Sequence, residues 1–242
     1  MCVTSGEGGS LARVVRVDPR TTVLRRTADD TDPVERVIVA NPEQLVVVTA
    51  LADPEPRTRL IDRCLVAAYD AGLAPLLCLT KADLADAEPI LDIYRPLGVP
   101  HVVTRRDEDP AALRDRLQGR VSVFVGSSGV GKSTLVNTLV PGADRATGVV
   151  NDVTGRGRHT STSAIALALP DGGWVIDTPG IRSFGLAHVN PRHVIRAFPD
   201  LYEISESYEG GCPRGCNNAG SEPECALDLA VEAGLVEAAR MA

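Results

Sequence analysis

Lysine is scarce in this 242-residue chain: only two of its 25 lysine and arginine residues are lysines, Lys81 and Lys132. Arginine supplies every other positive side chain. A guanidinium is a broad planar fork, whereas an ammonium is a compact charge on a flexible stem, so the two are not interchangeable in a tight site. The two lysines are therefore the first candidates for functional side chains.

Long apolar runs and an excess of positive charge are also missing. No stretch has the length of a membrane span or the form of a secretory signal. Six cysteines in a chain of this length do not make a disulfide framework. The net charge of −7 excludes a surface that is basic throughout, so any RNA contact must come from local arginine patches. We expect a monomeric, soluble, cytoplasmic protein that does not bind a membrane.

Residues 126–134 read GSSGVGKST and directly follow the apolar run 121–125. They fit the phosphate-binding loop G-x-x-x-x-G-K-[ST] between a strand and a helix, which is the context that this motif requires. Glycines let backbone N–H groups point at a phosphate, and a helix N-terminus adds its positive dipole. The pattern predicts that Lys132 reaches the β- and γ-phosphates and that the Ser133 hydroxyl binds Mg²⁺. A glycine-rich turn without a ligand is the alternative, and the strand–loop–helix frame argues against it.

The other lysine lies in a TKAD sequence at residues 80–83. It fits the [NT]-K-x-D motif of GTPases, in which a carboxylate such as that of Asp83 accepts hydrogen bonds from guanine N1–H and the exocyclic amine, donors that adenine does not offer in this arrangement. A DTPG sequence at residues 177–180 fits D-x-x-G, in which Asp177 meets Mg²⁺ through water and the Gly180 N–H meets the γ-phosphate. TKAD alone is weak support, but together with the phosphate loop it predicts a GTP site.

The motifs stand in an unusual order. In most GTPases the phosphate loop comes first and the base-reading motif last, whereas here TKAD precedes the phosphate loop by about one βα unit. The core therefore looks circularly permuted. With GRGRHTST at residues 155–162 and a cysteine-rich segment at residues 212–225, the chain resembles the small-ribosomal-subunit-dependent GTPase A family (RsgA, also called YjeQ).

The resemblance implies an α/β fold: a circularly permuted P-loop GTPase domain, an N-terminal OB-type β-barrel and a small C-terminal helical, zinc-knuckle-like domain. We place the GTPase domain at residues 42–188 and the cysteine-rich helical domain at residues 189–242. Residues 1–41 are too short for a five-stranded barrel, so we expect a truncated OB-type β segment there. The 44% hydrophobic composition is ample for one α/β core.

The N-terminal segment is arginine-rich after a polar start. Residues 1–10 are small, polar and glycine-rich, and we expect them to be disordered. The arginines that follow are either the remainder of an RNA-facing surface or ordinary solvated side chains on edge strands. They are Arg13, Arg16, Arg20, Arg25 and Arg26.

Hydrophobic periodicity predicts alternating strands and helices over the rest of the chain. Strands are expected at residues 12–17, 22–24, 37–40, 45–48, 76–79, 101–104, 121–125 and 174–176. Helices are expected at residues 56–71, 87–97, 111–117, 133–139, 191–198 and 223–232. Cys64 and Cys78 fall on apolar faces, where they are most simply small core residues.

Residues 144–163 form a long, polar, glycine-rich stretch, and a loop of that length inside a compact domain is usually functional or mobile. In a GTPase it is the switch that closes over the γ-phosphate, with Thr160, or otherwise Thr162, as the threonine that reaches Mg²⁺. Many GTPases place a glutamine after D-x-x-G to orient the attacking water, but Ile181 stands there. The neighbouring His159 is the candidate replacement; the alternative is that it only packs or contacts RNA.

The predicted site draws on all of these motifs. Lys132, His159 and Thr160 are expected to be catalytic, and Ser133, Thr160 and Asp177 to bind Mg²⁺. The resemblance also implies a second base-contacting loop, in which the family usually has a Ser-Ala-like pair. This chain departs from that pattern, because it has Thr104 followed by two arginines at that place, and Thr104 is the residue expected to contact the base. The expected GTP-binding residues are Thr80, Lys81, Ala82, Asp83, Thr104, Gly126, Ser127, Ser128, Gly129, Val130, Gly131, Lys132, Ser133, Thr134, Asp177 and Gly180.

A zinc site is the remaining prediction. The thiols of Cys212, Cys216 and Cys225 have a spacing that suits zinc. The family's ligand set resembles Cys, Cys, His, Cys, but Asn218 occupies the histidine position here. Asn218, a water or a carboxylate would complete the site, and the alternative is a knuckle held by its turns without metal.

We therefore expect a GTPase that converts GTP to GDP and phosphate. The resemblance implies that the small ribosomal subunit, with its rRNA, stimulates it and that it acts in late maturation of that subunit, binding in the GTP state and leaving after hydrolysis. Two alternatives remain: a nucleotide-gated module that binds RNA or the ribosome with little or no catalysis, and a GTP-sensing regulator unrelated to ribosomes.

Overall fold

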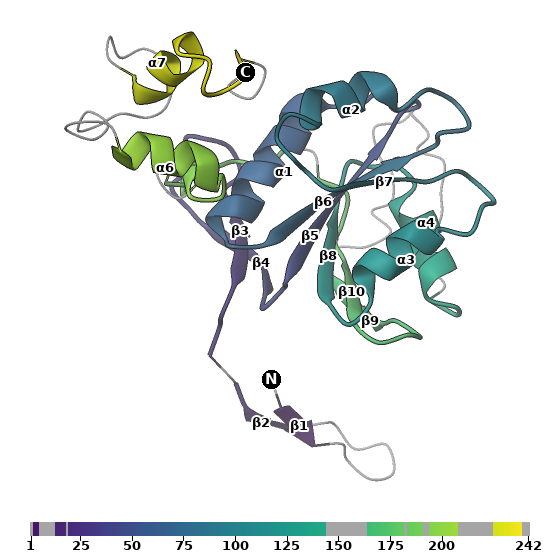
Figure 1. The fold of residues 1–242 in the computed structure, drawn as a ribbon. Helices are drawn as coiled ribbons and strands as arrows, with labels where there is room; N and C mark the ends of the chain where they lie inside the picture. Colours follow the sequence, from purple (N-terminus) through teal and green to yellow (C-terminus); the bar gives the residue numbers. More distant parts are fainter. Residues whose placement is uncertain are drawn as a thin grey trace.

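A six-stranded sheet forms the centre of the computed structural model, in the order β7-β6-β5-β8-β10-β9 (Figure 1). The first five strands in this order run parallel, and β9 is antiparallel to β10. The structure describes residues 2–4, 13–17, 19–143, 164–181, 183–190, 194–207 and 225–238. The strands of this sheet are β5 (Gln44–Ala50), β6 (Ala74–Thr80), β7 (His101–Val103), β8 (Val121–Val125), β9 (Ile165–Ala168) and β10 (Trp174–Asp177).

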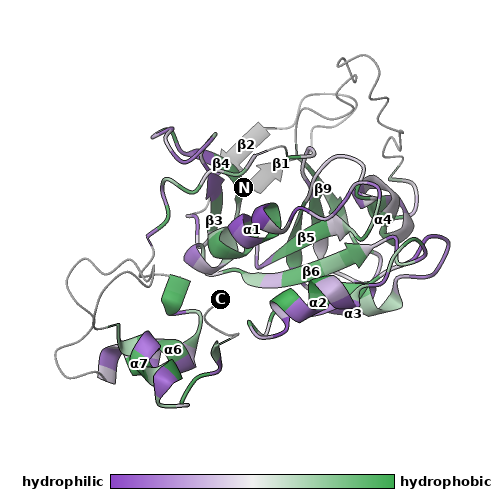
Figure 2. Cartoon of the chain, turned by 90° about the horizontal axis from the view of Figure 1, so that it is seen from above, coloured by the Kyte–Doolittle hydropathy of each residue, from purple (hydrophilic) through white to green (hydrophobic). Residues whose placement is uncertain are grey.

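Strand β5 is covered on both faces, and all seven of its residues are buried. Side chains alternate between the faces of a strand, so Leu45 and Val47 join one hydrophobic cluster while Val46 and Val48 join the other. A strand buried on both sides is mostly apolar at successive positions, which is why residues 45–48 read as a continuous hydrophobic run. The largely hydrophobic colour of β5 in Figure 2 follows from this position.

Two helices cover each face of the sheet (Figure 1). The cluster on one face includes side chains of α1 (Thr58–Asp70) and α2 (Glu88–Tyr94). The cluster on the other includes side chains of α3 (Ala111–Leu117) and α4 (Lys132–Leu139). The predicted helix at residues 111–117 is confirmed at both ends, and the other three differ from prediction by at most three residues at either end.

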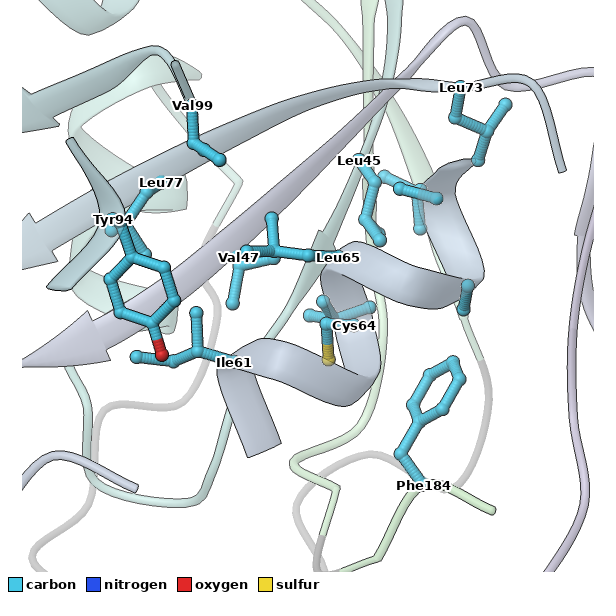
Figure 3. Packing of buried hydrophobic residues seen from close by; sticks show 14 of the residues in the cluster. Leu45, Val47, Ile61, Cys64, Leu65, Leu73, Leu77, Tyr94, Val99 and Phe184 are labelled. Atoms are coloured by element: carbon cyan, nitrogen blue, oxygen red, sulfur yellow. The ribbon is translucent and has the colours of Figure 1, made fainter. Parts of the chain in front are cut away.

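Helix α1 buries one stripe against the sheet (Figure 3). Ile61, Cys64, Leu65 and Ala68 are spaced as neighbours on one face of a helix, and each is at most 3% exposed. Cys64 and Cys78 are fully buried, and burial raises the pKa of both thiols to about 12. This confirms them as core residues and makes them poor nucleophiles at neutral pH.

Two short hairpins form the N-terminal part. Strand β1 (Cys2–Thr4) pairs with β2 (Arg13–Arg16), and β3 (Val23–Arg26) pairs with β4 (Arg36–Ala40), both antiparallel. The expectation of disorder throughout residues 1–10 is therefore wrong at Cys2–Thr4. The strand forms there because ladder hydrogen bonds come from the backbone and do not need apolar side chains.

The C-terminal part contains α6 (Pro199–Ser207) and α7 (Ala226–Glu232). The helix predicted over residues 191–198 differs from the structure: its first three residues lie outside the described part, residues 194–195 are helical, and the full helix starts at Pro199. Proline suits a first helical position because its missing N–H would be unpaired there anyway. The Phe198 ring meets Tyr69 of α1 edge-on, with centroids 4.9 Å apart. In the described part of the chain, no helix combines the length and apolar character that a membrane crossing needs.

Candidate functional site

Four predicted motifs meet at one edge of the sheet. Strands β6, β7, β8 and β10 are parallel, so their carboxyl ends lie on the same side. The motif residues directly follow these ends, at residues 81–83, 104–106, 126–131 and 178–180. This edge is where open α/β sheets bind ligands.

The phosphate loop, residues 126–134, has a backbone that only glycine allows at three positions. An added Cβ at Gly126 would lie 2.3 Å from the Val48 carbonyl oxygen. Gly129 and Gly131 have φ of 82° and 88°, which side chains other than hydrogen rarely permit. Gly131 is the N-cap of α4, and no acidic side chain lies in the first helical turn. The start of α4 therefore keeps its positive dipole end for an anion.

Lys132 links the phosphate loop to the DTPG segment, residues 177–180. Its ammonium donates hydrogen bonds to the Asp177 carboxylate and to the Thr178 backbone carbonyl. The Thr178 hydroxyl in turn donates to the Phe124 carbonyl at 2.7 Å. Lys132, Asp177 and Thr178 are all at most 8% exposed. An ammonium has three N–H donors, and two acceptors of the Lys132 ammonium are the Asp177 carboxylate and the Thr178 carbonyl. A phosphate that binds to this loop would therefore meet the Lys132 ammonium beside a buried carboxylate.

The end of the DTPG segment rests on the phosphate loop. An added Cβ at Gly180 would lie 3.1 Å from the Ser128 backbone nitrogen, tighter than side chains tolerate without movement. The Ile181 N–H donates to the Gly126 carbonyl at 3.0 Å. Ile181 itself is 8% exposed and belongs to the core cluster on the α1 face. A side chain at position 180 would therefore require the Ser128 backbone to shift by a few tenths of an ångström.

Thr80 joins the base-reading motif to the phosphate loop. Its hydroxyl lies 2.6 Å from the Val130 carbonyl oxygen, to which it donates, and its Cβ lies 3.8 Å from the position of an added Cβ at Gly131. The residue is 4% exposed. The threonine hydroxyl thus gives the carbonyl of buried Val130 a hydrogen-bond partner.

Lys81 reaches a loop that the sequence analysis did not include in the site. It has a φ of 59°, and its ammonium donates to the backbone carbonyl of Asp53. The same loop places the Pro54 Cδ 3.6 Å from the position of an added Cβ at Gly129. Residues 51–57 thus lie between the lysine of TKAD and the phosphate loop. Asp-Pro marks a turn, but no local pattern would have shown that this turn meets the loop.

Asp83 and Thr104 belong to neighbouring loops. The Asp83 carboxylate is exposed and accepts a hydrogen bond from the Arg106 N–H at 3.4 Å. The Ala82 N–H donates to the Thr104 carbonyl at 3.2 Å. The Thr104 side chain is 8% exposed, and its backbone N–H donates to the Leu79 carbonyl at 2.7 Å. The structure therefore brings the predicted second base loop beside the TKAD motif.

The predicted switch and zinc residues fall mostly outside the described part of the chain. These are His159, Thr160, Thr162, Cys212, Cys216 and Asn218. Cys225 is described: it precedes α7, is 5% exposed and packs with Leu201 and Leu227. In the described ranges, no three His, Cys, Asp or Glu side chains gather as they would around a metal ion. The predicted roles of these residues in binding and catalysis therefore stay predictions.

The chain matches one family model and many curated proteins. The model described as RsgA GTPase matches residues 17–187. A protein named "Small ribosomal subunit biogenesis GTPase RsgA" from Ectopseudomonas mendocina (strain ymp) is 46% identical over 214 residues, which cover 85% of this chain and 61% of the relative. The protein of the same name from Pseudomonas fluorescens (strain SBW25) is 43% identical over 232 residues, covering 92% and 65%. The chain thus spans less than two thirds of the length of either relative.

Two solved structures have a similar fold. The crystal structure of YjeQ from Thermotoga maritima superposes with a TM-score of 0.65 at 29% identity, covering 95% of this chain and 74% of that one. The structure of YloQ, described as a circularly permuted GTPase, superposes with a TM-score of 0.66 at 26% identity, covering 98% and 74%. This likeness agrees with the permuted order of motifs in the sequence.

Proposed function

The chain belongs to the RsgA GTPase family, and from that premise we propose that it hydrolyses GTP to GDP and inorganic phosphate. The observation that supports this most directly is that two separate motifs, TKAD and DTPG, make three contacts with the phosphate loop. Thr80 of TKAD bonds to Val130, Asp177 of DTPG pairs with Lys132, and Gly180 lies against Ser128. A glycine-rich turn without a ligand would not need a base-reading motif and a D-x-x-G motif packed onto it.

In this proposal the phosphate loop binds the triphosphate through its amides and Lys132. When phosphates enter, the Lys132 ammonium exchanges the Thr178 carbonyl and the Asp177 carboxylate for phosphate oxygens. Ser133, half-buried in the first turn of α4, and Thr160 would hold Mg²⁺ through their hydroxyl oxygens, and Asp177 would hold it through water. Mg²⁺ bound there would neutralise charge that develops on the phosphates. The Gly180 N–H would donate to the γ-phosphate.

Guanine recognition is assigned to the two loops beside the phosphate loop. Asp83 would accept the two guanine donors, and the Lys81 stem would lie along the nucleotide. Thr104 would hold the second loop against the first, because its backbone bonds to Leu79 and Ala82. An adenine base lacks the donor pair that an aspartate at this position accepts, so ATP should bind poorly.

We also propose that the small ribosomal subunit and its rRNA stimulate the hydrolysis, during late maturation of that subunit in the cytoplasm. The names of the curated relatives support this partner. The N-terminal arginines are the candidate RNA contacts, although Arg25 pairs with Glu35 at 2.8 Å and Arg26 donates to the Ser183 carbonyl at 3.2 Å. A zinc ion held by Cys212, Cys216 and Cys225, with Asn218 or a water as the fourth ligand, remains part of the proposal.

The second candidate is a nucleotide-gated binding module with little or no catalysis. The burial of Ile181 favours it, because the residue after D-x-x-G is an apolar core side chain and cannot orient water. GTP turnover measured with and without purified small ribosomal subunits separates the candidates. Strong stimulation supports the proposed GTPase, nucleotide binding without turnover supports the binding module, and turnover that ignores the subunit supports a regulator unrelated to ribosomes. If the protein binds neither GTP nor GDP, all three are wrong.

A further inference from the structure

The segment after the DTPG motif is attached at both ends. At its start, Gly180 and Ile181 contact the phosphate loop. At its end, residues 183–186 bond to the N-terminal β segment: Thr27 and Gly185 exchange two backbone hydrogen bonds of 3.1 and 3.2 Å. An added Cβ at Gly185 would lie 2.3 Å from the Asp29 carbonyl oxygen, so this junction is tighter than the Gly180 contact with the phosphate loop, where the distance is 3.1 Å.

Asp30 and Arg63 close this junction. The two Asp30 oxygens accept from the two terminal nitrogens of Arg63 at 2.6 and 2.5 Å. One Asp30 oxygen also accepts from the Leu186 N–H at 3.0 Å, and Arg63 donates to the Phe184 carbonyl at 3.0 Å. The ion pair therefore holds both the N-terminal segment and the segment after DTPG on helix α1. The Arg63 hydrogen bond lowers the pKa of Asp30 to about 2, because the guanidinium favours the ionised carboxylate.

Helix α1 extends the connection to the nucleotide site. Phe184 packs beside Cys64 of this helix (Figure 3) and is 1% exposed. The loop that leads into α1 is the one whose Asp53 carbonyl accepts from Lys81. A groove of about 580 Å³ runs along the junction, lined by Pro56, Arg57, Ser183 and Gly185 among others. The junction is thus packed on one side and open on the other, which leaves room for a small displacement.

We propose that the Asp30–Arg63 pair is a positioning latch, which holds Gly180 where it can donate to a γ-phosphate and which couples the N-terminal β segment to the bound nucleotide. The proposal rests on the GTPase function proposed above, because it concerns the γ-phosphate contact of that same site. In GTPases the segment around D-x-x-G is ordered by the γ-phosphate and released on hydrolysis. Here a movement of the segment after DTPG would strain its hydrogen bonds to Thr27 and Asp30. Coupling is reciprocal, so a partner that binds the N-terminal segment more tightly in the GTP state would in turn favour GTP over GDP.

The first test compares the affinities for a non-hydrolysable GTP analogue and for GDP. Arg63→Ala and Asp30→Asn should each weaken binding of the GTP analogue about fivefold or more relative to binding of GDP. GDP has no γ-phosphate to accept a hydrogen bond from the Gly180 N–H, so its affinity should not depend on the latch. The matched control is Arg114→Ala on α3, which removes a similarly exposed ion pair with two hydrogen bonds to Asp109. This variant should leave the ratio of the two nucleotide affinities unchanged. Equal losses for both nucleotides, or no change in the ratio, overturn the latch.

The second test uses the unmodified protein and so does not depend on how a variant folds. Hydrogen exchange at the Thr27, Gly185 and Leu186 amides should slow more with the GTP analogue than with GDP. Equal protection by the two nucleotides overturns the coupling. A protein that binds guanine nucleotides but fails both tests has the proposed site without the latch. A protein that binds no guanine nucleotide refutes the proposed function and, with it, the latch.

Discussion

Lys132 and Asp177 form a buried ion pair between the first residue of α4 and the last residue of β10. Their side chains are 8% and 2% exposed. The two residues that are predicted to bind phosphate and Mg²⁺ thus neutralise each other. A buried charge without its partner is costly, so the stability of the fold depends on the same two residues that are predicted to bind phosphate and Mg²⁺.

The first prediction concerns that pair. Lys132→Met should lower the free energy of unfolding of the nucleotide-free protein by about 3 kcal/mol, because it leaves the Asp177 carboxylate buried without its cation. Adding Asp177→Asn should restore most of the stability but not nucleotide binding. Urea unfolding measures both effects. The control is Lys81→Met, which removes a hydrogen bond to a backbone carbonyl and should cost only about 1 kcal/mol. Unchanged stability in Lys132→Met would show that the pair is not a structural contact in solution.

The second prediction concerns the choice of base. Asp83→Asn should weaken GTP binding by about 2 kcal/mol, because the amide offers a donor where guanine needs an acceptor. Xanthosine triphosphate, which carries an oxygen in place of the amine, should bind the variant better than the native protein. Asp92→Asn on α2 removes the same charge away from the site and should change neither affinity. Should ATP and GTP compete equally for the native protein, the base-reading role of Asp83 is wrong.

The motif residues of the site could be located from the sequence because each motif is local and follows an apolar run. The run at residues 121–125 becomes β8, and parallel pairing alone then brings the carboxyl ends of β6, β7, β8 and β10 together. Strand β9 was not predicted, because its four residues are all apolar and show no polar–apolar alternation. Three of them are exposed, and the strand is defined by its backbone pairing to β10.

The contacts between motifs could not be predicted in the same way. Arg63 lies 33 residues from Asp30 and 121 residues from Phe184, and no periodicity relates positions so far apart. The motif patterns assign Lys132 and Asp177 to a ligand but do not show that they pair with each other in its absence. Such contacts depend on how the helices and the N-terminal segment pack on the sheet. Only the folded chain reveals them.

The third prediction concerns zinc. If Cys212, Cys216 and Cys225 hold zinc, the purified protein should carry about one zinc ion per chain, and Asn218→His should tighten the binding because imidazole is a better zinc ligand than a carboxamide. Elemental analysis after purification under reducing, chelator-free conditions measures the first, and competition with a chromogenic chelator the second. Asn217→His, one position away from the expected ligand, is the control. Protein that contains no zinc rules out the site.

The last prediction concerns how water is activated. Ile181 is a buried member of the core cluster and donates its N–H to Gly126, so neither its side chain nor its amide can orient the attacking water. The free protein should therefore hydrolyse GTP slowly. Ile181→Gln should not speed it up, because the added amide would be buried in an apolar cluster and would lower stability by about 1–3 kcal/mol. A faster Ile181→Gln variant would show that the side chain at this position faces the γ-phosphate.

The missing polar group is assigned to His159, which precedes the proposed Mg²⁺-binding Thr160 in the sequence. An imidazole there could orient or deprotonate water once the subunit orders the loop. His159→Ala should then reduce subunit-stimulated turnover by about a hundredfold while GTP affinity stays nearly the same, because the group acts on the water and not on the ground-state nucleotide. Single-turnover rates at saturating subunit measure this, with subunit binding followed in parallel. If the variant loses subunit binding, or keeps its stimulated rate, His159 is not the catalytic group. The attacking water must then be oriented by Thr160, the backbone or ribosomal RNA.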